Sequence, residues 1–221
     1  MPDMILEIKL ISDATLGRGD GIAGEVDAEV QHDQYGFPYL SGRTLKGLLV
    51  QECADVLQTL PEDKKQEWHD AAAYLFGYPG SATANSGHMI VSDAQLPADL
   101  REAVSNDVRN GKLSRQDVLE SLTALRRQTA MESSGVPKEH SLRSVRVVLR
   151  QTTFRSEIFF DDAQVKKDVK EKARNLLAVC AASLRRLGTG RNRGRGLVET
   201  RLLNAKGEPV STAAFFEEVK A

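Results

Sequence analysis

Cysteines, long apolar runs and internal repeats are scarce or missing in this 221-residue chain. The two cysteines, Cys53 and Cys180, form no CxxC pair and have no histidine at metal-ligand spacing, which argues against a zinc site. Both fall on apolar faces of expected helices, so we expect reduced core residues. No apolar run reaches the roughly 20 residues of a membrane span, and no basic leader precedes an apolar stretch. We therefore expect a cytoplasmic globular protein.

The chain does carry abundant charge, and this charge is divided unevenly along the sequence. Residues 1–110 hold 8 Lys and Arg against 18 Asp and Glu, which leaves 22 and 13 of the totals for residues 111–221. This asymmetry predicts a polyanion-binding surface on one side of the fold. The alternative is that the acidic and basic faces pair with each other, or head to tail between copies.

Apolar periodicity predicts a single α+β domain. Alternation predicts strands, and the 3.6-residue period predicts helices. The expected strands cover residues 4–11, 88–92, 145–149, 154–160 and 197–203, and the expected helices cover 44–60, 68–76 and 164–187. Strand, helix, strand, strand, helix, strand is the order of a ferredoxin-like (RRM-like) split βαβ fold. With no repeat and no low-complexity tail, residues 1–221 are expected to form one domain.

An insertion at about residues 95–144 interrupts the middle strands of this pattern. Within it, the segment Ser114–Asp117 has capping-box spacing and predicts a helix that runs to about Gln128. The segment from Gln128 to His140 contains serine, glycine and proline, which predicts an exposed loop or arm.

The most informative segment, residues 188–196, packs four glycines and three arginines into nine positions. Glycine lets the main chain approach a ligand closely, and arginine offers forked donors that match phosphate oxygens. We call residues 188–196 the glycine–arginine loop. Its predicted nucleic-acid-binding residues are Gly190, Arg191, Asn192, Arg193, Gly194 and Arg195. The alternative is a tight helix-to-strand connection with solvated arginines.

A second segment, residues 40–47, combines glycine and basic residues where a helix is expected to begin. Free backbone N–H groups and the helix dipole favour an anion there. We call residues 40–47 the helix-start segment. Its predicted phosphate ligands are Ser41, Gly42, Arg43, Thr44 and Lys46, although a lysine in the first turn of a helix is also ordinary. Two such segments far apart in sequence favour a nucleic-acid-binding function.

The ordered set of motifs resembles the RAMP superfamily of CRISPR systems, and most closely its Cas-seven-type subunits, the repeated backbone of type III effector complexes. Four segments carry the resemblance. They are residues 26–47, with Asp27, Asp33 and the helix-start segment; Leu75-Phe76-Gly77 with the strand that ends at Val91-Ser92-Asp93-Ala94; residues 126–154; and the glycine–arginine loop. The resemblance implies a ferredoxin-like fold, guide and target RNA as ligands, other effector subunits as partners, and head-to-tail stacking of copies or paralogues.

The insertion resembles the thumb that reaches over the guide–target duplex in this family. The resemblance implies that Arg126, Arg127 and Arg143 contact RNA. Lys138 and His140 are further basic residues of the arm. Met131, Val136 and Pro137 are apolar and could form a wedge between base pairs. A solvated basic loop without such a role is the alternative.

The resemblance also implies a catalytic residue. Asp27 lies six residues before Asp33, at the spacing of the family's aspartate for metal-dependent cleavage of target RNA. Asp27 would hold Mg²⁺, weakly without RNA, or orient a ribose 2′-OH, with Glu25 and Glu29 as possible helpers. An Asx-turn role for Asp27 is the alternative.

Two further functions stay open at this point. A Cas-six-like guide-processing ribonuclease would use a histidine as acid and base, and His32 is its candidate. A purely structural filament subunit would bind guide RNA without cutting it.

Overall fold

The computed structural model describes residues 1–21, 26–78, 86–130, 132–136, 141–161 and 165–220. Its elements in chain order are β1 (Met4–Leu10), α1 (Gly42–Gln58), α2 (Glu62–Phe76), β2 (Met89–Val91), α3 (Ala98–Arg109), α4 (Arg115–Leu122), β3 (Thr123–Gln128), β4 (Arg143–Val148), β5 (Thr153–Phe160), α5 (Lys167–Ser183), a 3₁₀ turn (Arg191–Arg193), β6 (Val198–Asn204) and α6 (Ala213–Lys220). None of the described helices is long and apolar enough to cross a membrane.

The central sheet has four antiparallel strands in the order β2-β5-β1-β6. With α1 after β1 and α5 after β5, this order is that of the ferredoxin-like fold. The predicted fold class is therefore confirmed. Ile8 pairs with Phe154 on β5 and with Thr200 on β6, so β1 lies in the middle of the sheet.

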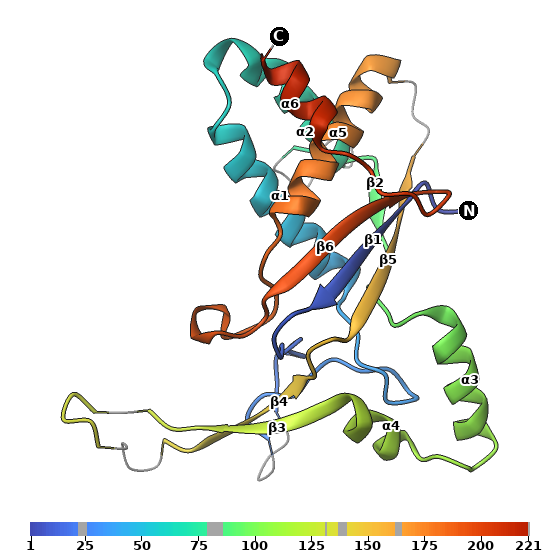
Figure 1. Ribbon diagram of the computed structural model, residues 1–221, viewed down its shortest axis with the longest axis vertical. Coiled ribbons are helices and arrows are strands. Elements are labelled where there is room, and N and C mark those ends of the chain that lie inside the picture. Colours follow the sequence, from blue (N-terminus) through green and yellow to red (C-terminus); the bar gives the residue numbers. More distant parts are fainter. Residues whose placement is uncertain (22–25, 79–85, 131, 137–140, 162–164, 221) are drawn as a thin grey trace.

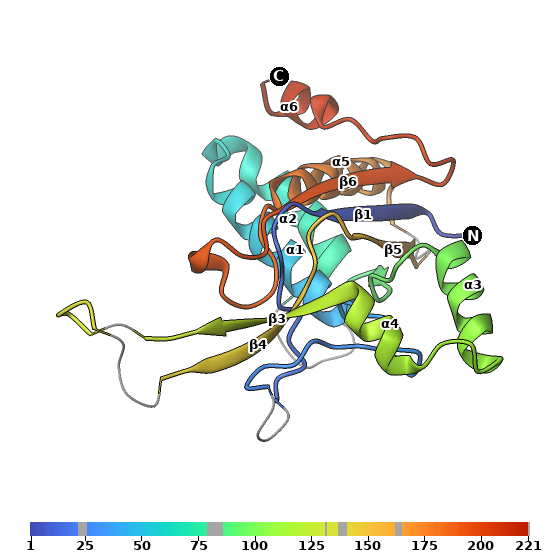
Figure 2. The same ribbon diagram turned by 60° about the horizontal axis from the view of Figure 1, so that its bottom comes forward.

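Helices α1, α2 and α5 cover one face of this sheet (Figure 1). The alternation of β1 explains the core, because Leu6, Ile8 and Leu10 are fully buried. On α1 the buried positions Leu45, Leu49 and Cys53 follow the helical period. None of the described helices lies over the other sheet face in Figures 1 and 2.

The insertion forms α3, α4 and a separate two-stranded sheet of β3 and β4. We call β3 and β4 the hairpin arm; it projects away from the body of the protein (Figures 1 and 2). Ser114 and Asp117 make the predicted capping box of α4. The predicted helix to Gln128 was wrong, because α4 ends at Leu122 and the chain continues as β3. Pairing along the whole of β4 satisfies the backbone of β3, and sequence periodicity cannot reveal such a distant partner.

The structure differs from the sequence analysis at three other helices. Helix α5 ends at Ser183 and not at Leu187, because Leu187 donates its backbone N–H to the carbonyl of Gly196 and so belongs to an extended segment. Helices α3 and α6 were not predicted. Phe215 of α6 is buried, and its ring centroid lies 4.5 Å from that of Trp68 on α2 in a tilted arrangement, so this short helix depends on tertiary packing.

Candidate nucleic-acid interface

A cleft of about 860 Å³ lies between the glycine–arginine loop and the hairpin arm. We call it the arginine cleft. Its lining residues are Gln51, Gln128, Arg143, Val145, Arg186, Gly188, Thr189, Gly190, Arg191, Asn192, Arg193 and Arg195. Five of these are arginines and none is acidic. In Figures 1 and 2 the loop and the arm extend from the same side of the molecule.

The backbone of the glycine–arginine loop depends on glycine at its two ends. A Cβ at Gly196 would lie 1.9 Å from the carbonyl oxygen of Leu187, and one at Gly188 would lie 2.5 Å from that of Thr15. Between these points the 3₁₀ turn of Arg191–Arg193 keeps its side chains at the surface. The loop thus packs tightly at its base and presents arginines at its tip.

The loop arginines have few acidic partners among the described residues. Arg193 donates to Oε1 of Gln128 at 3.3 Å, and Arg186 donates to the carbonyl of Arg191 at 2.8 Å. Both acceptors are neutral, so the guanidinium charges are not compensated there. Arg191 also lies near α1. Burial raises the pKa of Glu52 on this helix, and the negative charge of Asp55 adds to the rise. The positive charge of Arg191 opposes it.

The arm contributes one of its two faces to the cleft. Cross-strand pairing of Gln128 with Arg143, and of Arg126 with Val145, puts these four residues on one face. Arg127 pairs with Ser144 and lies on the opposite face. The predicted ligands Arg126 and Arg127 therefore cannot line the same surface, and Arg143 is the predicted arm residue that the cleft contains.

Asp13 joins the two walls of the cleft, and the sequence analysis missed it. Its Oδ2 accepts from Nη2 of Arg126 at 2.8 Å, and its Oδ1 accepts from the backbone N–H of Arg150 at 3.1 Å. Its backbone carbonyl accepts from Gly196 at 2.9 Å. Burial raises the pKa of the Asp13 carboxyl group, but the hydrogen bonds that it accepts from Arg126 and Arg150 outweigh burial, so its pKa is lowered. One residue thus fixes the arm relative to the loop.

The helix-start segment directs most of its polar groups into the protein. Gly42 donates its backbone N–H to Oδ1 of Asp93 at 2.8 Å, and a Cβ on Gly42 would lie 2.2 Å from the carbonyl of Val91. Ser41 caps the helix through the N–H of Thr44, and the two hydroxyls are 2.8 Å apart. The N-terminus of α1 is therefore largely satisfied by protein groups.

Lys46 and Arg43 differ within that segment. Nζ of Lys46 donates to the carbonyl of Met89 at 2.8 Å, and burial lowers the pKa of its ammonium group. Lys46 thus ties α1 to β2. Arg43 is exposed at the surface, where its guanidinium is accessible to a ligand.

Asp27 is exposed beside the arm. Its backbone N–H donates to the carbonyl of Ser144 at 2.8 Å, and its Oδ2 accepts from the N–H of Ser144 at 2.6 Å. Asp27 thus adjoins β4, the strand whose residues Arg143 and Val145 line the cleft, although Asp27 is not itself a lining residue. The Asx-turn geometry belongs to Asp33 instead, whose Oδ1 accepts from Tyr35 and Phe37.

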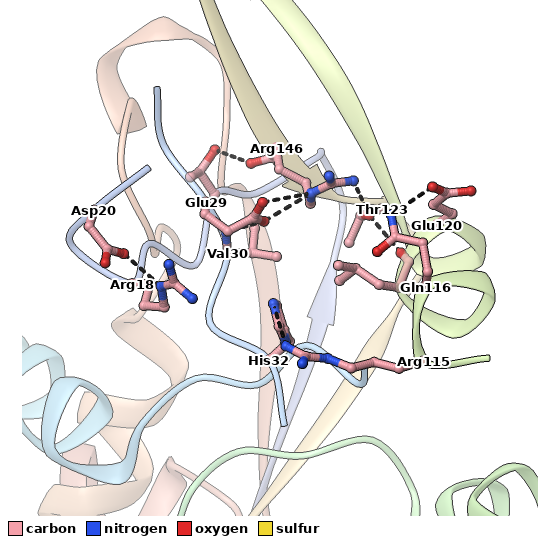
Figure 3. Close-up of polar contacts among 12 residues, drawn as sticks. Arg18, Asp20, Glu29, Val30, His32, Arg115, Gln116, Glu120, Thr123 and Arg146 are labelled. Carbon is pink, nitrogen blue, oxygen red and sulfur yellow. Dashed lines mark hydrogen bonds and ion pairs between the residues drawn. The ribbon is translucent and has the colours of Figure 1, made fainter. Parts of the chain in front are cut away.

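Glu29, two residues after Asp27, forms a buried ion pair with Arg146 (Figure 3). Glu29 is 1% exposed and its Oε1 is 2.9 Å from Nε of Arg146 on β4. The backbone N–H of Arg146 also donates to the carbonyl of Ala28, and Ala28 bridges to Val145 in parallel. Residues 27–29 therefore run along β4. Glu29 is committed to this structural pair, and Glu25 lies outside the described residues.

The described part of the chain contains no complete set of protein ligands for a metal ion. No group of three carboxylate, histidine or cysteine side chains is placed to hold an ion. Asp27 has one carboxylate oxygen engaged by Ser144 and offers the other. This arrangement fits a Mg²⁺ ion whose remaining ligands are RNA phosphates and water.

His32 lies apart from the arginine cleft. Its Nδ1 is 3.1 Å from Nη2 of Arg115 on α4, and Figure 3 shows the ring beside that side chain. A guanidinium donates only, so Nδ1 acts as an acceptor there. Of the proposed wedge residues, Val136 is 57% exposed. Met131, Pro137, Lys138 and His140 lie outside the described residues.

A second hollow on the open sheet face has a different character. It measures about 480 Å³, and acidic and basic side chains alternate across it. Glu7 pairs with Arg155 at 2.9 Å, and Glu199 pairs with Arg201 at 2.6 Å. These carboxylates already neutralise the cations, so this face suits a phosphate backbone less well than the arginine cleft does.

The fold and the cleft together define a class: a ferredoxin-like domain with a long insertion and an arginine-lined cleft beside a glycine-rich loop. The sequence profile of the RAMP superfamily matches residues 7–199. The chain belongs to the RAMP superfamily. No protein with a curated description matches the sequence.

Similar solved structures come from CRISPR complexes. A chain of the type III-B Cmr-beta complex bound to cognate target RNA is 14% identical, with a TM-score of 0.62, over 90% of this chain and 96% of that chain. A chain of the same complex in its apo state is 15% identical, with a TM-score of 0.62, over 91% and 97%. A chain of a type IV-B CRISPR complex is 17% identical, with a TM-score of 0.62, over 94% and 92%. At such identities the likeness establishes the fold.

Proposed function

We propose that this chain is an RNA-binding backbone subunit of a CRISPR effector complex and holds guide RNA in the arginine cleft. The observation that carries the proposal is the cleft itself, in which five arginines and no acidic side chain converge from two segments far apart in the sequence. The fold of subunits from CRISPR complexes supports it. Copies or paralogues would stack head to tail along the guide, together with other effector subunits.

Arginines grip the sugar-phosphate backbone without reading the bases, because the guanidinium fork matches two phosphate oxygens. If each of the five cleft arginines neutralises one phosphate of a single strand, log affinity falls with log salt at a slope of about −3.5. Affinity is then nearly independent of base sequence.

Fluorescence anisotropy with single-stranded RNAs of two unrelated sequences, over a range of salt concentrations, tests this proposal. We expect similar affinities for both sequences and the steep slope given above. Purification from a host that transcribes guide RNA should also yield a regularly stacked ribonucleoprotein. A purified chain that carries no RNA and binds neither probe at low salt would contradict the proposal.

Cleavage of paired target RNA is the finer part of the proposal. The free carboxylate oxygen of Asp27 would accept a hydrogen bond from a ribose 2′-OH and orient it toward the adjacent phosphorus. The new bond from the 2′-oxygen and loss of the 5′-oxygen leave a cyclic phosphate and a 5′-hydroxyl, with the proton passing to the leaving oxygen through solvent. In the alternative role, the same oxygen of Asp27 would hold Mg²⁺, weakly without RNA, and the ion would stabilise the phosphate charge.

The matched variants Asp27→Ala and Asp20→Ala test this step in the assembled complex. Asp20 is an exposed carboxylate paired with Arg18 and is not among the residues that line the cleft. We expect Asp27→Ala to slow target cleavage by about 10²–10⁴-fold and Asp20→Ala to leave it unchanged. Loss of activity only with His32→Ala would favour guide processing, and an inactive wild-type complex would favour a purely structural subunit.

A further inference from the structure

The segment that carries Asp27 makes few backbone contacts with the hairpin arm. The N–H of Asp27 donates to the carbonyl of Ser144 at 2.8 Å, and the N–H of Arg146 donates to the carbonyl of Ala28 at 3.0 Å. Among the described residues, a single β-bridge, Ala28 with Val145, joins this segment to β4. Backbone groups repeat along a strand, so two such hydrogen bonds can also form in a shifted register. The backbone alone therefore does not fix where Asp27 lies along β4.

The side chains of Glu29 and Arg146 fix that register (Figure 3). Nε of Arg146 lies 2.9 Å from Oε1 and 3.1 Å from Oε2 of Glu29. Oε1 also accepts from the N–H of Val30 at 2.8 Å. A shift by one residue would turn Glu29 to the other side of the strand, and a shift by two would move it about 6.6 Å along the strand. The ion pair can therefore form in one register only.

Arg146 also connects the Asp27 segment to two other parts of the chain. Its Nη1 donates to Oγ1 of Thr123, the first residue of β3, at 3.3 Å. Its backbone carbonyl accepts from Oγ1 of Thr15 at 3.2 Å. Both members of the ion pair are buried, with Glu29 1% exposed and Arg146 8% exposed. Well-packed apolar residues of comparable size are often as stable as such a pair, and the best-attested use of a buried polar pair is to specify one arrangement.

We infer that Arg146 is a positioning residue for the cleavage proposed at Asp27. It holds Glu29, which lies two residues from Asp27, and so keeps Oδ2 of Asp27 at 2.6 Å from the backbone nitrogen of Ser144. The other oxygen of the carboxylate then points to one fixed place. Arg146 itself is buried and is not among the residues that line the arginine cleft, so it acts through Asp27 and not on RNA. The inference rests on the proposed function, because this placement matters for cleavage only if Asp27 acts on RNA.

The double substitution Glu29→Leu with Arg146→Met tests the inference in the assembled complex. It replaces both charges by apolar side chains, whereas either single substitution would leave a buried charge without its partner. We expect the melting temperature to fall by no more than about 3 °C and the affinity for single-stranded RNA to stay unchanged, since the cleft arginines remain. Target cleavage at saturating RNA should slow by about 10–100-fold with an unchanged KM, because a displacement of about 1 Å at a reacting group can cost that much.

Hydrogen exchange of single amides, measured by NMR on the full-length chain, gives a readout that does not depend on activity. The N–H of Ser144 donates to Asp27, so its exchange should become at least about tenfold faster in the double variant. The N–H of Val148 donates to the carbonyl of Ala14 at 2.8 Å and reports on the rest of β4. We expect its exchange to be unchanged.

A matched control makes the same chemical change at another ion pair. Glu7 and Arg155 lie 2.9 Å apart on the open sheet face, and neither lines the arginine cleft. Glu7→Leu with Arg155→Met should leave both the cleavage rate and the exchange of Ser144 at their wild-type values.

The outcomes separate this inference from the cleavage proposal. Slower cleavage at an unchanged KM, with faster exchange of Ser144 and a normal control, supports the inference. Wild-type cleavage and exchange in the double variant, together with an inactive Asp27→Ala complex, overturn it and leave the cleavage proposal intact. A double variant that does not fold also overturns it, because the pair then serves stability. If Asp27→Ala cuts at the wild-type rate, the cleavage proposal fails and the role of Arg146 fails with it.

Discussion

The helix-start segment and the glycine–arginine loop have similar compositions, but most polar groups of the first bind other protein groups, whereas those of the second face a cleft. In the first, Asp93 and the carbonyl of Met89 receive the hydrogen bonds of Gly42 and Lys46. In the second, Arg193 donates its described side-chain hydrogen bond to the neutral amide of Gln128, and the arginines line a cleft. The comparison teaches that glycine and basic residues create an anion site only where nearby acceptors leave them free.

Removing the loop's charge is the strongest way to test this difference. Substituting Arg191, Arg193 and Arg195 together by alanine should lower RNA affinity by at least about a hundredfold and reduce the salt slope by about 2, since three phosphate contacts are lost. The free energy of unfolding should change little, because these arginines lie at the surface or half-buried. Anisotropy and urea unfolding measure both quantities, with the exposed Lys206→Ala as control. An unchanged salt slope would contradict the account of the cleft.

The helix-start segment should respond in the reverse way. Asp93→Ala leaves the N–H of Gly42 without its acceptor at the buried start of α1. We expect the free energy of unfolding to fall by about 1–2 kcal/mol. RNA affinity, measured well below the melting temperature, should stay within about threefold of wild type. A large loss of affinity with full stability would show that this helix terminus binds phosphate after all.

Lys46→Met tests whether this single cation stabilises the protein or binds a phosphate. The methionine keeps the apolar stem but removes the hydrogen bond to the carbonyl of Met89. We expect a loss of about 1 kcal/mol in the free energy of unfolding, because Lys46 is only partly buried and solvent screens it. The salt slope for RNA should not change. A decrease of about 0.7 in that slope would instead assign one phosphate to Lys46.

Asp13→Asn should give the smallest change in the free energy of unfolding, and this change should depend on pH. Its pKa in the folded protein lies below the usual value of 3.8. The stabilisation from its contact with Arg126 is therefore complete above about pH 4 and is lost as the pH falls through the lowered pKa. Asp13→Asn should cost less than about 1 kcal/mol at neutral pH, and the difference from wild type should shrink at about pH 2. Urea unfolding at both pH values measures this; a constant difference would argue against the ion pair.

The sequence predicted the fold well because the four core strands and both long helices have clear periodicities. It failed where long-range contacts decide the structure. Pairing with β4 converts residues 123–128 into a strand, and contact with Trp68 stabilises α6. No local pattern contains that information.

The candidate site was predicted in part for the same reason. The glycine–arginine loop is a local motif, so its residues could be found directly. Asp13 and Gln128 join the site only through tertiary contacts, and nothing in their local sequence indicates this. Arg186 could have been found, because it lies only two residues before the loop. The opposite directions of Arg126 and Arg127 follow from strand alternation, which the expected helix concealed.

Ultraviolet crosslinking of the protein to single-stranded RNA, with mass spectrometry of the attached peptides, tests the central claim most directly. The account predicts crosslinks in the peptides that contain Arg143 and residues 186–195. Crosslinks confined to the open sheet face, around Arg155 and Arg201, would contradict it.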